Sequence, residues 1–152
     1  MNDKLKQLTL ALEKHIEQFE MSNDAVSKST IGWQLEHIFL STSMILLALK
    51  QSNPSEYKWS FKIPKLLVFT MGKIPRGKAK APSVVVPQTF DKDSLQKHFQ
   101  KVIFQIDELK QIDQNQFFNH PFFGNLKLKD TIRFLEIHTK HHSEIIRDIV
   151  KG

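Results

Sequence analysis

Cysteine is absent from this chain of 152 residues. Disulfide bonds, thiolate nucleophiles and cysteine-based zinc or iron–sulfur sites are therefore excluded. Histidine and the carboxylates remain as the side chains that can hold a metal ion, and the chain has seven histidines and sixteen acids.

Long apolar runs are also absent. None reaches the roughly 18–20 residues that a membrane-spanning helix needs. Residues 1–20 carry charges throughout and lack the continuous apolar core of a signal peptide. The composition, 40% hydrophobic and 25% charged, is that of an ordinary globular protein. We therefore expect a cytoplasmic protein that folds as one domain over residues 1–152.

Apolar residues recur at helical spacing in four long segments, which predicts four helices. The second has two apolar stripes, one through Trp33 and Leu40 and one through Ile31 and Leu35. It is therefore expected to pack on two sides, like a helix inside a bundle. The patterns favour an all-α fold, a four-helix bundle. The predicted helices cover residues 3–20, 30–50, 94–112 and 128–151.

The connection between the second and third predicted helices is more than forty residues long. Such a length is uncommon without structure, so we expect a short helix or an extended piece within it. Residues 57–63 alternate apolar and polar side chains, which is typical of a strand. Four prolines later in the connection argue against a long regular element. Residues 120–124, HPFFG, predict a second structured connection. Gly124 permits a left-handed turn there, and the paired phenylalanines can plug the end of the bundle.

The net charge of +6 is concentrated in residues 50–80, the basic segment. This segment contains eight lysines and arginines and one acid, Glu56, so it carries +7 and the rest of the chain −1. Such a run is usually a solvated connection. The alternative is a basic flap that steers or holds an anionic substrate or a phosphate-bearing surface.

Two histidines occupy core positions of the last predicted helix. Residues four apart lie about 40° apart around a helix, so both imidazoles point the same way. A buried imidazole without a partner costs on the order of 1–3 kcal/mol, whereas a shared metal ion occupies a lone pair on each ring. The pattern predicts a metal site, with a satisfied polar pair as the alternative. The apolar stripe consists of Leu128, Thr131, Leu135, His138, His142, Ile145 and Ile149.

A third ligand is expected from another buried helix. His37 lies on the Trp33 stripe of the second predicted helix, and three histidines from two helices leave coordination positions open for water or substrate. His141 lies at the edge of the core stripe and is expected to flank the site. The remaining histidines are expected to be structural: His15, His98 and His120.

The acids nearest in sequence to these histidines are Glu36 and Glu144. Either is a candidate catalytic residue, as a general base or as a group that orients a ligand imidazole. The more ordinary interpretation of each is a solvent-facing charge on an amphipathic helix.

Three stretches of the chain resemble the DinB-like superfamily of metal-binding four-helix bundles. Residues 32–38, GWQLEHI, resemble the second-helix motif of that family. Residues 120–126, HPFFGNL, followed by Arg133-Phe134 and residues 138–142, resemble its final connection and fourth helix, and residues 71–77, MGKIPRG, resemble the crossover of one branch. The resemblance implies an up-down-down-up bundle, with the long crossover between helices two and three, in a bacterial protein. It also implies the metal ligands His37, His138 and His142.

Two positions depart from the family pattern. Lys127 stands where Ser or Thr often precedes the fourth helix, and it cannot cap that helix through an oxygen. Ser143-Glu144-Ile145 stands where many members carry Gln shortly after the final ligand. These departures concern the surroundings of the ligands and the substrate preference rather than the fold.

Two functions are expected from these features. The first is a divalent-metal-dependent enzyme, a hydrolase or a thiol-dependent transferase acting on a small, anionic substrate. The resemblance implies this range, because related bundles include thiol-dependent transferases, a thiol-dependent isomerase and hydrolases. Without a cysteine of its own, a transferase would need a low-molecular-weight thiol as cosubstrate. The second function is a non-catalytic, metal-stabilised bundle that binds a partner or an anionic membrane surface through the basic segment.

The sequence restricts the identity of the cofactor and of the partners only in part. Three imidazoles are compatible with zinc, nickel, iron or manganese. No predicted helix combines base-reading polar residues with flanking basic ones, so binding to a specific nucleic-acid sequence is not expected. Pairing of two copies into a homodimer is an open expectation.

Overall fold

Helices dominate the architecture. The structure is a computed structural model that describes residues 2–77 and 80–152, so Lys78 of the basic segment lies outside the described residues. Within these ranges the chain forms five α-helices and one two-stranded sheet. They are α1 Asp3–Leu10, α2 Ile31–Gln51, α3 Ile63–Met71, α4 Lys92–Glu108, β1 Phe117–His120, β2 Gly124–Lys127 and α5 Leu128–Lys151. Among the described residues, no helix has the length and apolar character needed to cross a membrane.

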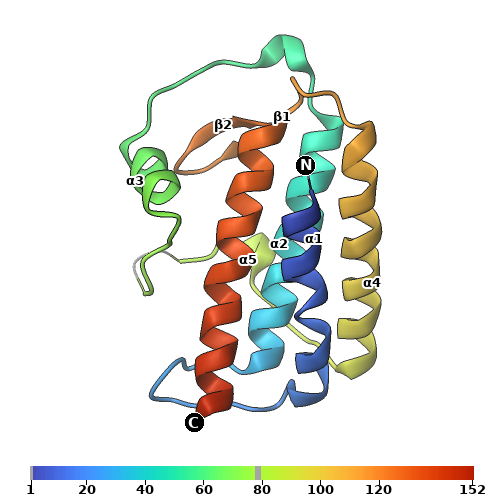
Figure 1. Cartoon of the computed structure of the whole chain (residues 1–152), viewed down its shortest axis with the longest axis vertical. Helices are drawn as coiled ribbons and strands as arrows, with labels where there is room; N and C mark the ends of the chain where they lie inside the picture. The colour runs from blue at the N-terminus through green and yellow to red at the C-terminus, as the bar shows by residue number, and fades with distance from the viewer. Residues whose placement is uncertain (1, 78–79) are drawn as a thin grey trace.

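The helices α1, α2, α4 and α5 stand side by side, whereas α3 lies apart from them (Figure 1). α2 packs on both α4 and α5, and α1 packs on the same two helices. The mostly helical architecture confirms the class expected from the sequence. The packing of α2 on two neighbours is what its two apolar stripes predicted.

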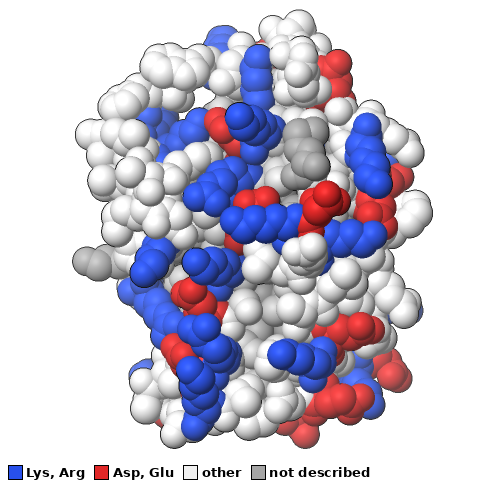
Figure 2. Space-filling view, viewed as in Figure 1, with Lys and Arg blue, Asp and Glu red and all other residues white. Residues whose placement is uncertain are grey.

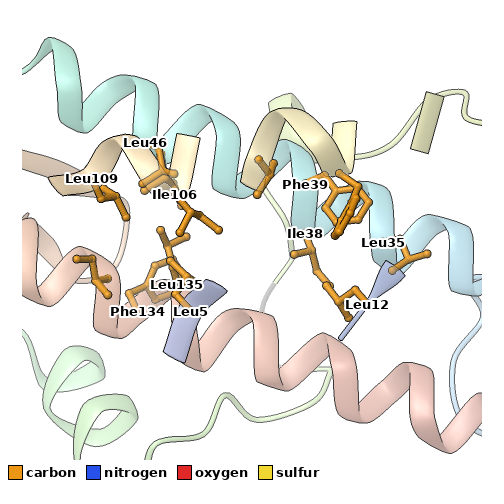
Figure 3. Close-up of a cluster of buried hydrophobic side chains, with 14 of the residues drawn as sticks. Leu5, Leu12, Leu35, Ile38, Phe39, Leu46, Ile106, Leu109, Phe134 and Leu135 are labelled. Carbon is orange, nitrogen blue, oxygen red and sulfur yellow. The ribbon is translucent and has the colours of Figure 1, made fainter. Parts of the chain in front are cut away.

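One hydrophobic core lies between these helices. Each contributes fully buried side chains, such as Leu5 of α1, Ile38 of α2, Ile106 of α4 and Leu135 of α5. Figure 3 shows part of this cluster, in which Leu12 belongs to the same group as Ile38. Burial of a leucine or isoleucine side chain contributes about 1.5–3 kcal/mol, so this core is the main source of stability.

α2 begins one residue after the predicted start, because Thr30 caps it. The Thr30 hydroxyl accepts a hydrogen bond from the Trp33 backbone N–H at 3.1 Å. In the first turn, the Gly32 N–H donates to the Phe19 carbonyl at 2.8 Å. A side chain at Gly32 would collide with the Phe90 ring and lie 2.8 Å from that carbonyl oxygen. Glycine is therefore required here for close packing rather than for its backbone freedom.

The first predicted helix is shorter and less regular than expected. The α-helical part ends at Leu10, and a 3₁₀ helix covers Glu13–Gln18. The Thr9 hydroxyl donates to the Leu5 carbonyl at 2.9 Å, and the Leu12 N–H donates to the Thr9 carbonyl, three residues before it. A threonine that bonds to its own helix in this way bends it, which accounts for the change of helix type.

The long crossover contains the expected short helix, α3, whereas the strand-like alternation over residues 57–63 does not lead to a strand. No described strand lies between α2 and α4. Tyr57 packs edge-on against Phe117, with ring centroids 5.6 Å apart, but Trp59, Phe61 and Ile63 are exposed. The segment lies beside β2, but the hydrogen bond that joins them comes from a side chain, since Asn125 donates to the Lys58 carbonyl at 3.1 Å.

The structured connection expected before α5 is a β-hairpin. β1 and β2 pair antiparallel, and Gly124 adopts the left-handed conformation with φ of 73°. Phe123 is buried, whereas Phe122 is exposed, so only one of the paired phenylalanines plugs the bundle. Lys127 provides no side-chain cap for α5. Instead, the Leu128 N–H donates to the Gln116 carbonyl at 3.0 Å.

Replacement of Gly32 by alanine tests the close packing at the start of α2. An alanine in a helix interior is ordinarily stabilising by about 1 kcal/mol relative to glycine. Here the added Cβ meets Phe90 and the Phe19 carbonyl, so we expect Gly32→Ala to destabilise the protein by about 1–3 kcal/mol. Urea denaturation followed by circular dichroism measures this change. Ser43→Ala, on the same helix, should change stability by less than about 0.5 kcal/mol. A stabilising Gly32→Ala would contradict the packing described.

The hairpin histidine predicts a pH dependence of stability. The Nδ1 atom of His120 accepts the backbone N–H groups of Phe122 and Phe123, and burial lowers the pKa of this imidazole from 6.5 to about 4. Because the pKa of His120 is lower in the folded protein, the unfolded chain binds a proton on this imidazole more readily. The stability that the neutral imidazole contributes is therefore complete above pH 6.5 and is lost as the pH falls toward 4. His120→Asn keeps an acceptor but does not titrate.

The free energy of unfolding should therefore fall more steeply between pH 6.5 and 4 for the wild type than for His120→Asn. The difference in slope is at most about 1.4 kcal/mol per pH unit. Urea denaturation at several pH values measures both slopes, and parallel slopes would contradict the prediction.

Candidate metal centre

Three buried histidines meet between α2 and α5. His37 comes from α2, and His138 and His142 come from successive turns of α5. One ligand atom from each lies within 4.8 Å of the others, and all three side chains are at least nine-tenths buried. The Nε2 atoms of His37 and His138 are 3.2 Å apart. The structure thus brings together the three histidines that the sequence singled out.

The outer nitrogens of two of these rings have fixed partners. The Nδ1 atom of His37 lies 2.8 Å from the Val85 carbonyl oxygen, and Nδ1 of His142 lies 2.6 Å from Oε1 of Gln34. A carbonyl oxygen can only accept, so each Nδ1 carries the proton and donates it. Each Nε2 is therefore left with a free lone pair. Second partners of this kind commonly fix the orientation and tautomer of a histidine that binds a metal.

The spacing of the nitrogens fits a shared ion. Two lone pairs on Nε2 atoms 3.2 Å apart repel each other unless a proton or a cation lies between them. Two nitrogens at about 2.0–2.1 Å from a tetrahedral zinc ion would be about 3.3 Å apart. The His37–His138 separation is close to that value. The residues present therefore suit a divalent ion held by three imidazoles.

The protonation state of the three rings also suits ligation. Burial lowers the pKa of His37, although the hydrogen bond to Val85 partly opposes this. Burial lowers the pKa values of His138 and His142 well below the ordinary value, and the neighbouring imidazoles lower them further. All three rings are consequently neutral near pH 7, which is the form that binds a metal.

His138 differs from the other two ligands in its surroundings. Its Nδ1 atom is buried and has no hydrogen-bond partner among the described residues. The ring is instead positioned by packing, because it lies against Phe134 with centroids 5.6 Å apart. Phe134 in turn contacts the ring of His120 at 4.7 Å. His120 therefore supports the site through an aromatic neighbour and is not itself a member of the cluster.

Trp33 covers the other side of the site. Its indole stacks on the His37 ring, with centroids 5.2 Å apart and planes 16° from parallel. The ring of His141 contacts that of His142 edge-on at 4.8 Å, so it flanks the cluster as expected. These aromatic contacts limit the rotation of the ligand rings.

The two candidate acids lie in different environments. Glu36 was expected to face solvent unless it served the site, but its side chain is 4% exposed and both carboxylate oxygens lie within 2.9 Å of Nδ1 of His98. Its partner is thus a histidine on α4, outside the cluster. Glu144 is partly exposed and lies 3.9 Å from Lys140. His15 is likewise outside the cluster, where it contacts Gln18.

A small pocket lies beside the histidine cluster on the other side of His141. Its volume is about 200 Å³, and its walls come from residues 72–76 of the crossover and from α5. Lys73, Arg76 and Lys140 supply positive charge, and Glu144 supplies a carboxylate. Arg76 also pairs with Asp148 at 2.8 Å, which ties the crossover to α5. The pocket is therefore cationic but not uniformly so.

Sequence reasoning missed the two groups that orient the ligands. Gln34 lies three residues before His37, so both occupy one face of α2, and this spacing was a usable signal. The Val85 contact comes from a main-chain carbonyl of the crossover, and no side-chain pattern reveals such a group. The pairing of Glu36 with His98 was also missed, because the two residues are 62 positions apart.

The comparisons with known proteins agree with this geometry. The family model of the DinB superfamily matches residues 20–146, a span that contains all three histidines. A search of the curated proteins and a search of the solved structures each gave no match. Because the family model covers most of the chain, the chain belongs to the DinB superfamily, whose members often bind metal ions.

Proposed function

We propose that this protein is a divalent-metal-dependent enzyme in which His37, His138 and His142 hold the ion. The observation that carries the proposal is the fixed tautomer of two ligands. Val85 and Gln34 hold the Nδ1 protons outward, so the Nε2 lone pairs of His37 and His142 are available in a dry core. We further propose the up-down-down-up helix order of the family for this single domain.

Three imidazoles leave other coordination positions for a substrate. A bound divalent ion supplies Lewis acidity, which polarises a carbonyl or phosphoryl oxygen or lowers the pKa of a coordinated nucleophile. The chain's own residues exclude water from the inner side, where Trp33 and Phe134 cover the ligand rings. Zinc, nickel, iron and manganese all remain compatible with this donor set.

The pocket beside His141 is the proposed position of the substrate. Lys73, Arg76 and Lys140 favour an anionic group, and Glu144 lies where a carboxylate can hold a proton near it. Glu36 is the weaker candidate, because His98 already occupies both of its oxygens. Hydrolysis and thiol-dependent transfer are the proposed reaction classes, and transfer requires an external thiol because the chain has no cysteine.

Removal of a ligand histidine tests both the ion and the activity. Protein purified without an affinity tag should contain nearly one divalent ion per chain, and His37→Ala, His138→Ala and His142→Ala should each lose it. Loss of one imidazole leaves too few ligands and an open cavity. Elemental analysis measures the ion. Turnover is measured on small anionic esters, and on an electrophile supplied with a low-molecular-weight thiol.

His98→Ala is the matched control, because it removes a histidine from the neighbouring helix but not from the cluster. It should retain the ion and the activity. Circular dichroism shows whether each variant is folded. Metal in the wild type with no turnover on either panel would favour the non-catalytic, metal-stabilised bundle. Failure of the wild type to bind any of the four metals would overturn the proposal itself.

Gln34 gives a sharper test, because it lies outside the ligand set. Gln34→Leu removes the acceptor for the His142 Nδ1–H, so metal affinity should fall about 10–100-fold. Gln34→Glu provides a carboxylate that accepts the same hydrogen bond, so it should retain most of the affinity. Competition with a chromophoric chelator measures the affinities. Equal affinities for Gln34→Leu and Gln34→Glu would show that this hydrogen bond does not orient the ligand.

A further inference from the structure

The outward face of α3 is apolar. Six large apolar side chains of the crossover are from 52% to 73% exposed, and they form what we call the α3 face. An exposed helix ordinarily presents polar residues to solvent. The α3 face consists of Trp59, Phe61, Ile63, Leu66, Leu67 and Met71.

The orientation of α3 is fixed from its inner side. Lys65 forms an ion pair of 2.6 Å with Asp130 of α5, and Phe69 packs edge-on against Phe123 of the hairpin at 5.9 Å. The segment just before α3 is held as well, because the Asn125 side chain donates to the Lys58 carbonyl at 3.1 Å. Specific contacts on the inner side of α3 thus hold these apolar side chains outward.

The segment of chain that carries the α3 face has charged side chains of one sign. The sequence from residue 57 to residue 90 contains no aspartate or glutamate. Lys58, Lys62 and Lys73 are exposed within this stretch. On the side of the molecule that carries α3, Figure 2 shows a largely uncharged surface with basic residues and a few acidic ones at its borders. A partner for this surface must therefore be apolar and negatively charged.

A groove enters the α3 face between residues 59–62 and the helix. Its volume is about 300 Å³, and its walls combine the apolar side chains of Trp59, Leu66 and Phe69 with Lys62 and Lys65. An apolar floor next to the Lys62 ammonium matches an acyl chain beside an anionic headgroup, whereas the Lys65 ammonium is already paired with Asp130. Aromatic residues and lysines together are typical of segments that lie in a membrane interface.

We propose that the α3 face docks the protein on an anionic membrane surface. The apolar side chains enter the boundary of the acyl chains, while Lys58, Lys62 and Lys73 contact anionic headgroups. A second copy of the chain is a poorer occupant. Two-fold pairing through this face would bring the lysines of both copies into one interface, and residues 57–90 contain no acid to compensate them.

Vesicle binding by the full-length protein tests the proposal. We expect it to sediment with vesicles in which half of the lipid is phosphatidylglycerol, but not with pure phosphatidylcholine, and binding should weaken as salt is added. Trp59 fluorescence should shift to the blue on binding. This shift should be absent in Trp59→Phe, which retains Trp33 as an internal reference.

Matched variants distinguish docking through the α3 face from nonspecific binding to vesicles. Leu67→Asp and Lys62→Glu should each reduce vesicle binding by at least about fivefold, the factor that corresponds to one lysine at an anionic surface. The same changes on α4, Phe104→Asp and Lys101→Glu, should have little effect, because both residues are exposed and α4 lies on the opposite side of the bundle from α3 (Figure 1). Circular dichroism shows that each variant is folded.

Three outcomes would overturn the proposal. One is no binding to anionic vesicles at low salt. Another is an equal loss of binding in the α3 and α4 variants, which would indicate attraction by net charge alone. The third is a dimer in light scattering that Leu67→Asp dissociates, with no vesicle binding, because the occupant would then be a second copy. The metal content is independent of all three, so this test does not depend on the proposed enzyme.

Discussion

The contact between His37 and His138 is the constraint on which the arrangement of α2 and α5 depends. Their Nε2 atoms lie 3.2 Å apart in a region that excludes water. A proton on one Nε2 atom joins the two rings in a hydrogen bond, and a cation in the same place binds both lone pairs. With neither, the buried polar groups would cost about 1–3 kcal/mol each. The close approach of the two helices at this point therefore depends on a shared proton or a shared ion between the rings.

The crossover between α2 and α4 serves the site at one end and faces outward at the other. Its last part, the 3₁₀ helix Ser83–Val85, brings a main-chain carbonyl to Nδ1 of His37. Its middle part, Gly72 to Arg76, forms one wall of the pocket beside His141. The α3 face, by contrast, turns apolar side chains away from the protein. A connection of this length is thus explained by the separate contacts that it makes, and not by a need to span the distance between two helices.

The elements that the sequence predicted well are those whose periodic apolar pattern extends over many residues. α2 and α5 end within one residue of their predicted limits, because two-sided and one-sided apolar stripes of over twenty residues leave little freedom. The histidine triad followed from the same stripes, since His37, His138 and His142 stand where apolar residues belong. The helix break near Leu12 depends on one threonine hydroxyl, and the hairpin depends on pairing between short segments. The strand-like alternation over residues 57–63 does not lead to a strand, because alternation alone does not supply backbone pairing. Such local or non-local contacts are not visible in a periodic pattern.

The different positions of Glu36 and Glu144 limit the chemistry that this site can perform. Glu36 is adjacent to His37 in sequence, but neighbouring residues of a helix point about 100° apart. Its side chain accordingly leaves the α2–α5 interface and reaches the partly exposed His98 on α4, which is the hydrogen-bond partner of the buried carboxylate. Glu144 lies two residues after His142 but follows His141 by three, so it shares the outer face of α5 with His141 and the pocket. A carboxylate that exchanges protons with a substrate needs access to that substrate, and of these two only Glu144 lines the pocket in which we propose that the substrate binds. The acid–base chemistry of the protein, where it has any, is therefore expected on the His141 side of α5 and not inside the bundle.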